Sequence, residues 1–384
     1  MFRTTRAKIT GPLDAFQRVR VSNPTTVFDS SYPDPRFWDE KLVGYATSVL
    51  TVPNGKILSV IAGGDEATSQ TFMRFYYQPG KSQQVMMTGR FSPEAGVVKR
   101  VGQFDGQNGI FLRVGDDEAE PSWHVMRGGV VTESAPQSEW SLDLLPSLDM
   151  SMAQIVAFDY QWLGVGTIRV GFFIDGEPRY VHAFHHANRS AVHPYMATAN
   201  LPLRCDIASE GGAGSLEQGC SSVTSEGGIE RIGTLHSIDN GITTVSAVTA
   251  GDLVALLAVR LRADRPDVIL VPELANVLVT TTNDNVRLAL MINPTLAASP
   301  YLDWQQETAF EWAVGTAAQL VTDPGDQIYS AYAPSDVRVL TIQPPSAQRI
   351  GVSIDGESDV LVLAAESLTN NVSLAGALTI RSVP

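Results

Sequence analysis

The clearest structural signal in the sequence lies in residues 167–184, which read TIRVGFFIDGEPRYVHAF. Both halves of this stretch are rich in β-branched and aromatic residues, as β-strands are. Asp175-Gly176 separates them, and Asp-Gly favours the tight primed turn of a hairpin because that turn needs positive φ. The stretch therefore predicts two antiparallel strands joined by a two-residue turn.

The same combination of short β-rich runs and turn residues recurs on both sides of this hairpin. Residues 56–61 (KILSVI) and 109–114 (GIFLRV) are two such runs, and IDGE occurs at both 174–177 and 354–357. The flanks of the two IDGE copies differ, so we interpret them as one turn chemistry used twice. No 10–15-residue helical patterns alternate with the strands, which argues against a parallel sheet. We expect an all-β fold, with a jelly-roll or lectin-like antiparallel β-sandwich followed by a second, smaller β domain.

One stretch interrupts the strand pattern. Residues 208–233 read ASEGGAGSLEQGCSSVTSEGGIERIG, rich in Gly, Ser and Glu and poor in apolar residues. Such a composition is typical of a linker or an extended crossing between cores. The domain prediction therefore runs in four parts: an extended N-terminal arm at 1–39, a β-sandwich at 40–207, a linker at 208–234 and a C-terminal β domain at 235–384.

Charge and hydropathy exclude some partners. The chain has 27 Lys and Arg against 41 Asp and Glu, a net charge of −14. An acidic chain repels phosphate backbones, so we expect no nucleic-acid partner. No apolar run reaches the roughly 18 residues of a membrane-spanning helix, and the opening MFRTTRAKITGP lacks the apolar core of a secretory signal. We expect no membrane partner.

Histidine is the first candidate for chemistry, because four histidines fall within YVHAFHHANRSAVHPY. His182, His185, His186 and His193 are dense enough to suggest a zinc or other transition-metal site. On a strand, however, His182 and His186 share one face while His185 points to the other. No Cys or carboxylate completes a known ligand set. We favour hydrogen-bonded histidines at a strand end or interface, and we predict no metal site.

Motifs for nucleophilic or cofactor chemistry are absent from the sequence. There is no G-x-S-x-G, no Walker loop and no G-x-G-x-x-G that opens a helix. Gly164-Val165-Gly166 fits a turn between strands better than an anion site. Cys205 and Cys220 are too few for a disulfide framework, so we expect two reduced thiols rather than one bridge. We predict no catalytic residues and no cofactor.

Carboxylates and aromatic residues form two further clusters. Asp116, Asp117, Glu118 and Glu120 could bind calcium or act as a glycosidase pair, but solvated carboxylates at a turn are the favoured interpretation. Six aromatic side chains could stack on sugars at the rim of the sandwich, although packing in a core or a subunit interface is favoured. These six are Trp123, Trp140, Tyr160, Trp162, Tyr180 and Tyr195.

A series of ordered stretches runs through residues 13–230. They are LDAFQRVRVSNPTTVFDS (13–30), FDGQNGIF (104–111), PQSEW (136–140), DYQWLGVG (159–166), IDG (174–176), HAN (186–188), YM (195–196), NLPLR (200–204) and SEGG (225–228). In this order the stretches resemble a family of tailed-bacteriophage virion structural proteins, whose N-terminal pattern is DAFGRLRVSNPxTLFDS. The chain departs from that pattern at Gln17, where Gly is commoner. Beyond residue 240 the similarity thins to VRLR at 259–262.

This resemblance implies a non-enzymatic structural component of a virion, made in the host cytoplasm and placed in the tail, fibre, neck or capsid. Its partners would be copies of itself and other virion proteins, and the resemblance favours three-fold or higher symmetry, such as a trimer. Eight apolar residues in the proline-containing arm suggest that the arm packs on its own sandwich and on a neighbouring subunit. The alternative function is a glycan- or receptor-binding adhesin of the virion. A capsule-degrading enzyme is the least favoured, because no acid/base pair stands out.

Overall fold

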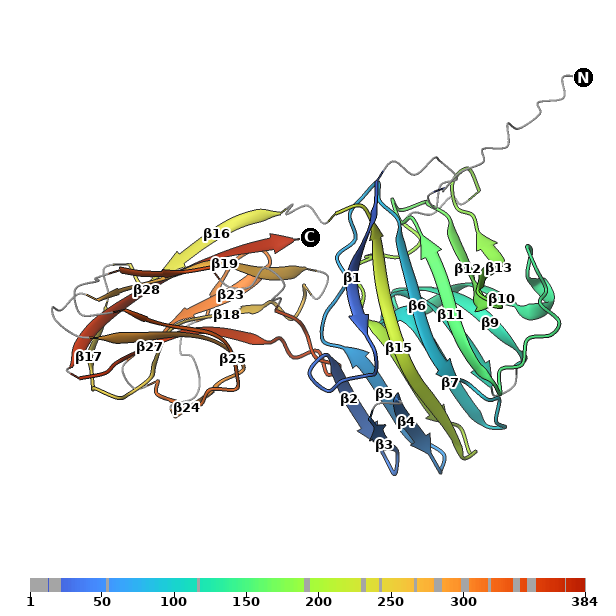
Figure 1. Cartoon of the computed structure of the whole chain (residues 1–384), viewed down its shortest axis with the longest axis horizontal. Helices are drawn as coiled ribbons and strands as arrows, with labels where there is room; N and C mark the ends of the chain where they lie inside the picture. Colours follow the sequence, from blue (N-terminus) through green and yellow to red (C-terminus); the bar gives the residue numbers. More distant parts are fainter. Residues whose placement is uncertain are drawn as a thin grey trace, which may run out of the picture. The chain divides into compact units, whose positions relative to one another are not determined.

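The computed structural model divides the chain into two compact units, Met1–Glu230 (unit 1) and Arg231–Pro384 (unit 2). Both units consist of antiparallel β-sheets (Figure 1). The structure describes residues 13, 22–52, 55–115, 118–189, 194–228, 233–241, 244–265, 268–279, 285–297, 304–316, 319–333, 339–343, 350–369 and 371–383.

Unit 1 is a sandwich of two sheets. The first sheet has eight strands in the order β13-β12-β11-β6-β15-β4-β3, with β1 also paired to β15. Its strands are β1 (Pro24–Ser30), β3 (Thr47–Thr51), β4 (Gly55–Val60), β6 (Gln83–Arg90), β11 (Ala153–Tyr160), β12 (Ile168–Ile174), β13 (Glu177–Phe184) and β15 (Gly214–Glu226).

The second sheet of unit 1 has seven strands in the order β10-β9-β8-β7-β14-β5-β2. A short 3₁₀ turn, η1 (Gln137–Glu139), follows β10. The strands are β2 (Trp38–Val43), β5 (Glu66–Thr71), β7 (Val97–Phe104), β8 (Gly109–Gly115), β9 (Glu118–Arg127), β10 (Val130–Pro136) and β14 (Leu203–Ser209).

The chain crosses repeatedly between these two sheets. It passes from β2 to β3 and β4, back to β5, over to β6, and later from β10 to β11 and from β13 through β14 to β15. Antiparallel strands that alternate between two facing sheets are the defining feature of jelly-roll sandwiches. The expected all-β, jelly-roll or lectin-like sandwich is confirmed.

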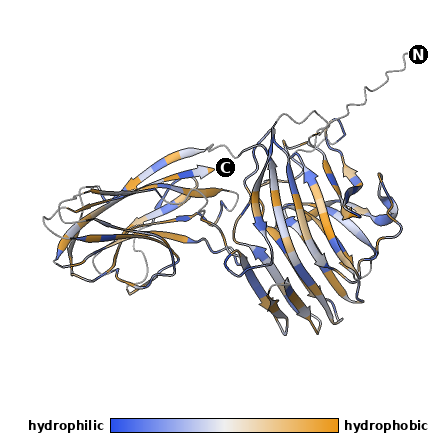
Figure 2. Cartoon of the chain, in the orientation of Figure 1, coloured by the Kyte–Doolittle hydropathy of each residue, from blue (hydrophilic) through white to orange (hydrophobic). Residues whose placement is uncertain are grey.

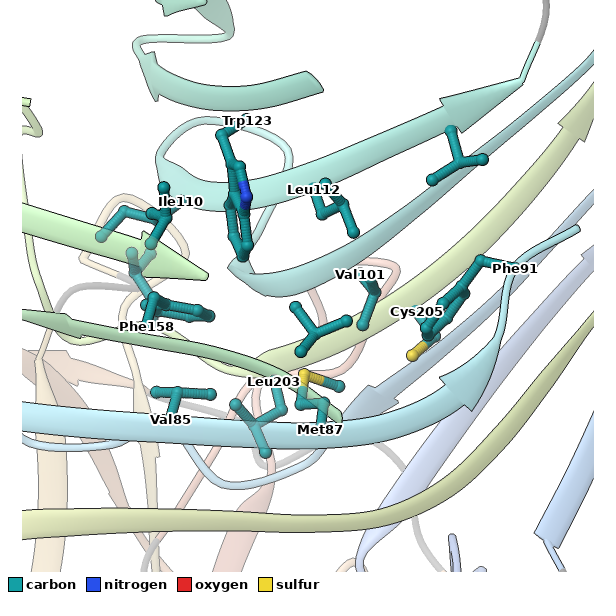
Figure 3. Close-up of a cluster of buried hydrophobic side chains, with 14 of the residues drawn as sticks. Val85, Met87, Phe91, Val101, Ile110, Leu112, Trp123, Phe158, Leu203 and Cys205 are labelled. Carbon is teal, nitrogen blue, oxygen red and sulfur yellow. The ribbon is translucent and has the colours of Figure 1, made fainter. Parts of the chain in front are cut away.

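The core of unit 1 follows the period-two pattern of its strands, visible as alternating colours in Figure 2. Along β6 the side chains of Val85 and Met87 are buried, while those of Met86 and Thr88, which alternate with them, are half-buried. Figure 3 shows Val85 near Phe158 and Met87 near Leu203, and Trp123 of the facing sheet lies with its ring centroid 5.9 Å from that of Phe158 in the same core. This shared core holds the two sheets together.

The hairpin predicted at 167–184 forms as expected. Ile174 pairs with Glu177, so the loop is the two residues Asp175 and Gly176. Their φ values are +54° and +80°, the positive values that a primed turn requires. The sequence stretch thus becomes β12 and β13, at one end of the eight-stranded sheet.

The predicted linker at 208–234 is wrong in its extent. Gly214–Glu226 forms β15, which pairs with β6 along one side and with β4 and then β1 along the other. Small polar residues such as Ser221 and Ser225 are buried along it, where a strand held by partners on both sides needs few apolar side chains. The division between the units falls within the predicted segment but near its end, between Glu230 and Arg231.

The predicted arm at 1–39 also needs correction, because residues 24–30 are strand β1 and Trp38 opens β2. Phe28 and Trp38 belong to the sandwich core, Val27 packs against it, and Phe37 is exposed. The other four apolar residues of the arm, Phe2, Phe16, Val19 and Val21, lie outside the described residues.

Unit 2 supplies the predicted second, smaller β domain. One sheet has the order β16-β28-β19-β26, with β17 also paired to β28, and another has the order β22-β23-β18-β27-β20-β25; β21 and β24 form a separate pair. The strands are β16 (Thr234–Asp239), β17 (Val245–Val248), β18 (Val254–Leu261), β19 (Ile269–Val279), β20 (Val286–Ile292), β21 (Thr295–Leu296), β22 (Gln305–Gln306), β23 (Phe310–Val314), β24 (Val321–Asp323), β25 (Asp326–Ala333), β26 (Val339–Ile342), β27 (Val360–Ser367) and β28 (Val372–Val383).

Two smaller points complete the description. Cys205 is buried in unit 1 and Cys220 is exposed, and both are free thiols, as expected. Across the described ranges, the chain contains no helix of the length and hydropathy needed to cross a membrane.

Candidate functional site

A cavity of about 410 Å³ opens at the end of unit 1 where β10 and β13, the terminal strands of the two sheets, lie close together. We call it the His186 pocket, after the buried histidine that joins its two sides. Its lining residues are Arg127, Thr132, Glu133, His185, His186, Arg189, Pro194 and Tyr195.

Two tight turns build one wall of this pocket. After β13, the amide of Arg189 donates to the carbonyl of His186 (3.0 Å), and Asn188 takes a φ of +59°. Asn tolerates this left-handed conformation better than most residues, and the turn returns Arg189 toward the histidines. The second turn, at Gly164–Gly166, is the strand connection that the sequence predicted. A Cβ on Gly166 would overlap the carbonyl oxygen of Gln161, so the turn requires glycine there.

His186 bridges the two sheets at this end of the sandwich. Its Nδ1 lies 2.5 Å from the carbonyl oxygen of Gly166, and its Nε2 lies 2.7 Å from Oε1 of Glu133 on β10. The ring stacks on Tyr195, with the centroids 4.1 Å apart. Because a carbonyl only accepts, Nδ1 carries a proton. A proton must also lie between Nε2 and the Glu133 carboxyl, so the two groups share it or form an ion pair.

The other charged groups of the pocket are two arginines. Arg127 at the end of β9 is half-buried and Arg189 is exposed. Burial, then the charges of Arg189 and His186, lower the pKa of His185, which therefore stays neutral at pH 7. With Glu133 held by His186, the two guanidinium groups leave the pocket positive on an acidic chain.

The remaining histidines of the sequence cluster do not converge on a metal. Nδ1 of His182 accepts a hydrogen bond from the amide of Ser141 (3.3 Å), and Nδ1 of His185 lies 3.2 Å from the hydroxyl of Thr167. His193 lies outside the described residues. Among the residues that are described, no group of three His, Cys, Asp or Glu side chains is placed to hold a metal ion.

The structure describes only part of the carboxylate cluster at residues 116–120. Asp116 and Asp117 lie outside the described residues, and of Glu118 only the backbone, in β9, is described. Glu120 accepts a hydrogen bond from the amide of Ser138 (2.7 Å), so its carboxylate supports the η1 turn.

The six candidate aromatic side chains do not form an exposed rim. Trp123, Trp140, Tyr160 and Tyr195 are buried, and Trp162 and Tyr180 are half-buried. Tyr180 donates to Asp159, whose carboxylate also pairs with Arg169. The favoured prediction of packing rather than sugar stacking holds for this set, and Tyr195 alone of the six lines the pocket.

Sequence reasoning found His185, His186 and Tyr195 but missed Arg127, Glu133 and Arg189. Glu133 lies 53 positions before His186 in the sequence. No spacing rule joins them, because their proximity depends on two different sheets ending at the same place.

A larger cavity of about 560 Å³ lies over β1, β6 and β15, with Phe37, Met86 and Ile155 among its lining residues. Several of its polar groups bond to one another: Tyr32 donates to Asp34 (3.1 Å), and the Cys220 thiol donates to the carbonyl of Ser31 (3.1 Å). It offers fewer available charges than the His186 pocket.

Comparison with known proteins yields distant structural similarity only. No protein-family model and no curated protein sequence matches the chain. Among solved structures it is similar to a Bacillus licheniformis β-glucanase (10% identity, 51% of this chain and 96% of that chain, TM-score 0.37). It is also similar to a legume lectin-like domain from Entamoeba histolytica (12% identity, 53% and 98%, TM-score 0.33). Similarity at this level carries no conclusion about activity or ligand.

Proposed function

We propose that the protein is a non-catalytic structural component of a tailed-bacteriophage virion, held in place by contacts between subunits. One observation carries the proposal. The ordered resemblance to virion structural proteins covers residues 13–230, and the first compact unit ends at Glu230. A similarity that ends with a folding unit is expected when that unit is a shared module.

An apolar surface at the opposite end of unit 1 from the His186 pocket also supports assembly. We use the name β2–β3 edge patch for the exposed apolar side chains on β2, β3 and the adjoining loops: Leu42, Tyr45, Val49, Val52 and Ile61, which are 46, 74, 53, 61 and 64% exposed. Strands β2 and β3 are the last strands of their sheets, and open edges with apolar side chains invite pairing with another chain.

The patch is held in shape by Asp65. Its Oδ1 accepts from the amide of Tyr45 (2.8 Å), and its Oδ2 accepts from the amides of Ile61 (3.0 Å) and Ala62 (2.9 Å). The two loops that carry the most exposed patch residues are therefore tied to one buried carboxylate. An ordered apolar surface loses less conformational entropy on association than a mobile one.

The virion role is tested by locating the protein on phage particles. Antibodies against the protein, applied to gradient-purified phage particles and imaged by electron microscopy, should label one region of each particle. Absence of the protein from purified particles, with the free protein left at the top of the gradient, would contradict the virion role.

Self-assembly is tested with a matched pair of variants. The double variant Tyr45→Ser/Ile61→Ser should lower the sedimenting mass toward that of a single chain. Val130→Ser removes an equally exposed side chain (64%) from β10 at the other end and should leave the mass unchanged. Deleting residues 2–21, which spares β1, measures the separate contribution of the arm. If all three proteins sediment like the full chain, neither surface joins the subunits.

A second candidate function is binding of a receptor glycan by the virion, and the His186 pocket is the observation that favours it. The cavity combines a buried aromatic wall with several hydrogen-bonding groups, which is the usual make-up of a small-ligand site. A glycan array probed with the purified chain tests this function. Incubation with host polysaccharide, followed by measurement of new reducing ends, tests the non-catalytic assignment.

A further inference from the structure

The His186 pocket has an electrostatic character opposite to that of the chain. Among the described residues that line it, Glu133 is the one acid, and His186 already holds its carboxylate. Arg127 and Arg189 form no ion pair with any other described residue. Two guanidinium groups thus face one cavity in a protein whose net charge is −14.

We propose that this pocket binds a carboxylate-bearing sugar, with Arg127 and Arg189 holding the carboxylate. This inference rests on the second candidate function, because it names the chemical class of the ligand at the same pocket. A guanidinium group presents parallel N–H donors that match the two oxygens of a carboxylate, and such charge-assisted pairs are stronger than neutral hydrogen bonds.

The rest of the cavity suits a sugar ring better than a bare anion. Its volume of about 410 Å³ lies within the range of pockets that hold small organic ligands. Pro194 supplies apolar surface. The Thr132 hydroxyl, which donates to the carbonyl of Val125 (3.2 Å), can still accept from a ligand hydroxyl, and the His185 ring, whose Nδ1 lies beside the Thr167 hydroxyl, can bond to another through Nε2. Inorganic phosphate would use the arginines and make no use of this apolar and hydroxyl-binding surface.

The test is calorimetric titration of the full chain with glucuronate, glucose and inorganic phosphate. Glucuronate should bind, and more weakly as ionic strength rises from about 0.05 to about 0.5 M, because salt screens the arginines. Glucose should bind at least roughly ten-fold more weakly, since it has the ring but no charge. Phosphate should also bind more weakly than glucuronate.

Substitution of the two arginines tests whether glucuronate binds in the His186 pocket. Arg127→Gln and Arg189→Gln should each weaken glucuronate binding roughly ten-fold or more. Arg90→Gln is the matched control, because Arg90 is an exposed arginine that pairs with Glu217 away from the pocket. The control should bind glucuronate as the native chain does.

Each alternative result is decisive. Equal binding of glucose and glucuronate would keep the glycan function and overturn the carboxylate assignment. Phosphate binding as tight as glucuronate binding would show a general anion site and overturn the sugar assignment. No binding of any of the three, or equal loss in all three arginine variants, would overturn the proposal at this pocket.

Discussion

At each end of the unit 1 sandwich, a buried basic side chain of one sheet pairs with a glutamate of the other sheet, but the residues differ. At one end Lys56 on β4 pairs with Glu40 on β2; at the other His186 pairs with Glu133 on β10. Each pair joins the two sheets near an end of the sandwich: β4 lies next to the last strand of its sheet, and His186 follows β13, while β2 and β10 are the last strands of the other sheet. Both basic side chains are buried, with 0% exposure for Lys56 and 3% for His186.

The surroundings of the two pairs differ, and so do the surfaces above them. The Lys56 ammonium lies inside the sandwich beside the Ser69 hydroxyl (3.3 Å), and the nearby exterior is the apolar β2–β3 edge patch. The His186 ring faces a cavity that two arginines make positive. The comparison suggests one end for protein contacts and the other for a small ligand.

Removing Glu40 should have the largest effect on stability. Glu40→Ala leaves the buried Lys56 ammonium without its carboxylate, and breaking such a pair from one side costs about 3 kcal/mol. Lys56→Met removes the buried charge instead and leaves Glu40, 32% exposed, to be solvated by water, so it should cost no more than about 1 kcal/mol.

Reaction of the Cys205 thiol with a thiol reagent measures this effect within unit 1. Cys205 is 1% exposed and burial raises the pKa of its thiol, so it reacts when the sandwich opens, whereas the exposed Cys220 reacts at once. Denaturant titrations of both variants and of Glu40→Ala/Lys56→Met give the free energies of unfolding. The double variant should resemble Lys56→Met; equal losses in the two single variants would contradict an uncompensated charge.

Much of the fold could be predicted from the sequence because local signals agreed with it. Asp175-Gly176 forms the turn that this dipeptide favours, and β-rich runs such as 109–114 form strands. The strand β15 escaped prediction because its buried side chains mix the polar Gln218, Ser221 and Ser225 with only two core apolar residues, Leu216 and Val223. Its place is set by partner strands on both sides, which composition does not reveal.

The candidate site was predictable only where its residues are close in sequence. His185 and His186 stand out in YVHAFHHANRS, and Gly166 in the WLGVG turn. Glu133 and Arg127 come from a different sheet, and Lys56 at the other end is one lysine in an ordinary strand pattern. Both bridges between the sheets depend on tertiary structure.

Glu133→Gln should have a smaller effect than Glu40→Ala, which sharpens the contrast between the two ends. A glutamine amide can donate to Nε2 while Nδ1 still donates to Gly166, so a neutral hydrogen bond replaces the charged pair. The expected loss is about 1 kcal/mol. Thiol labelling of Cys205 measures it, and His186→Phe, which keeps a ring against Tyr195 but makes neither bond, should lose more. Equal losses in the two variants would show that the hydrogen bond from Nδ1 of His186 to Gly166 adds nothing to stability.

The smallest expected effect is local and concerns the order of the β2–β3 edge patch. Hydrogen bonds from the backbone amide of Tyr45, then from those of Ile61 and Ala62, hold the pKa of Asp65 below its ordinary value of 3.8. A carboxyl whose pKa is lowered in the folded state stabilises that state fully above its unfolded pKa, and the contribution is lost as pH falls through the folded pKa. Acidification below about pH 4 should therefore raise amide hydrogen exchange at Tyr45, Ile61 and Ala62, after correction for the intrinsic pH dependence.

Asp65→Asn should show raised exchange at these three amides already at pH 7, with little further rise in acid. The control is Asp149→Asn, since the pKa of Asp149 is also lowered, by Ser151, but away from the patch. This control should keep the native exchange profile at Tyr45. If Asp65→Asn leaves exchange unchanged at neutral pH, the carboxylate does not order the patch. The two ends of the sandwich would then differ in charge, with no difference in how firmly their surfaces are held.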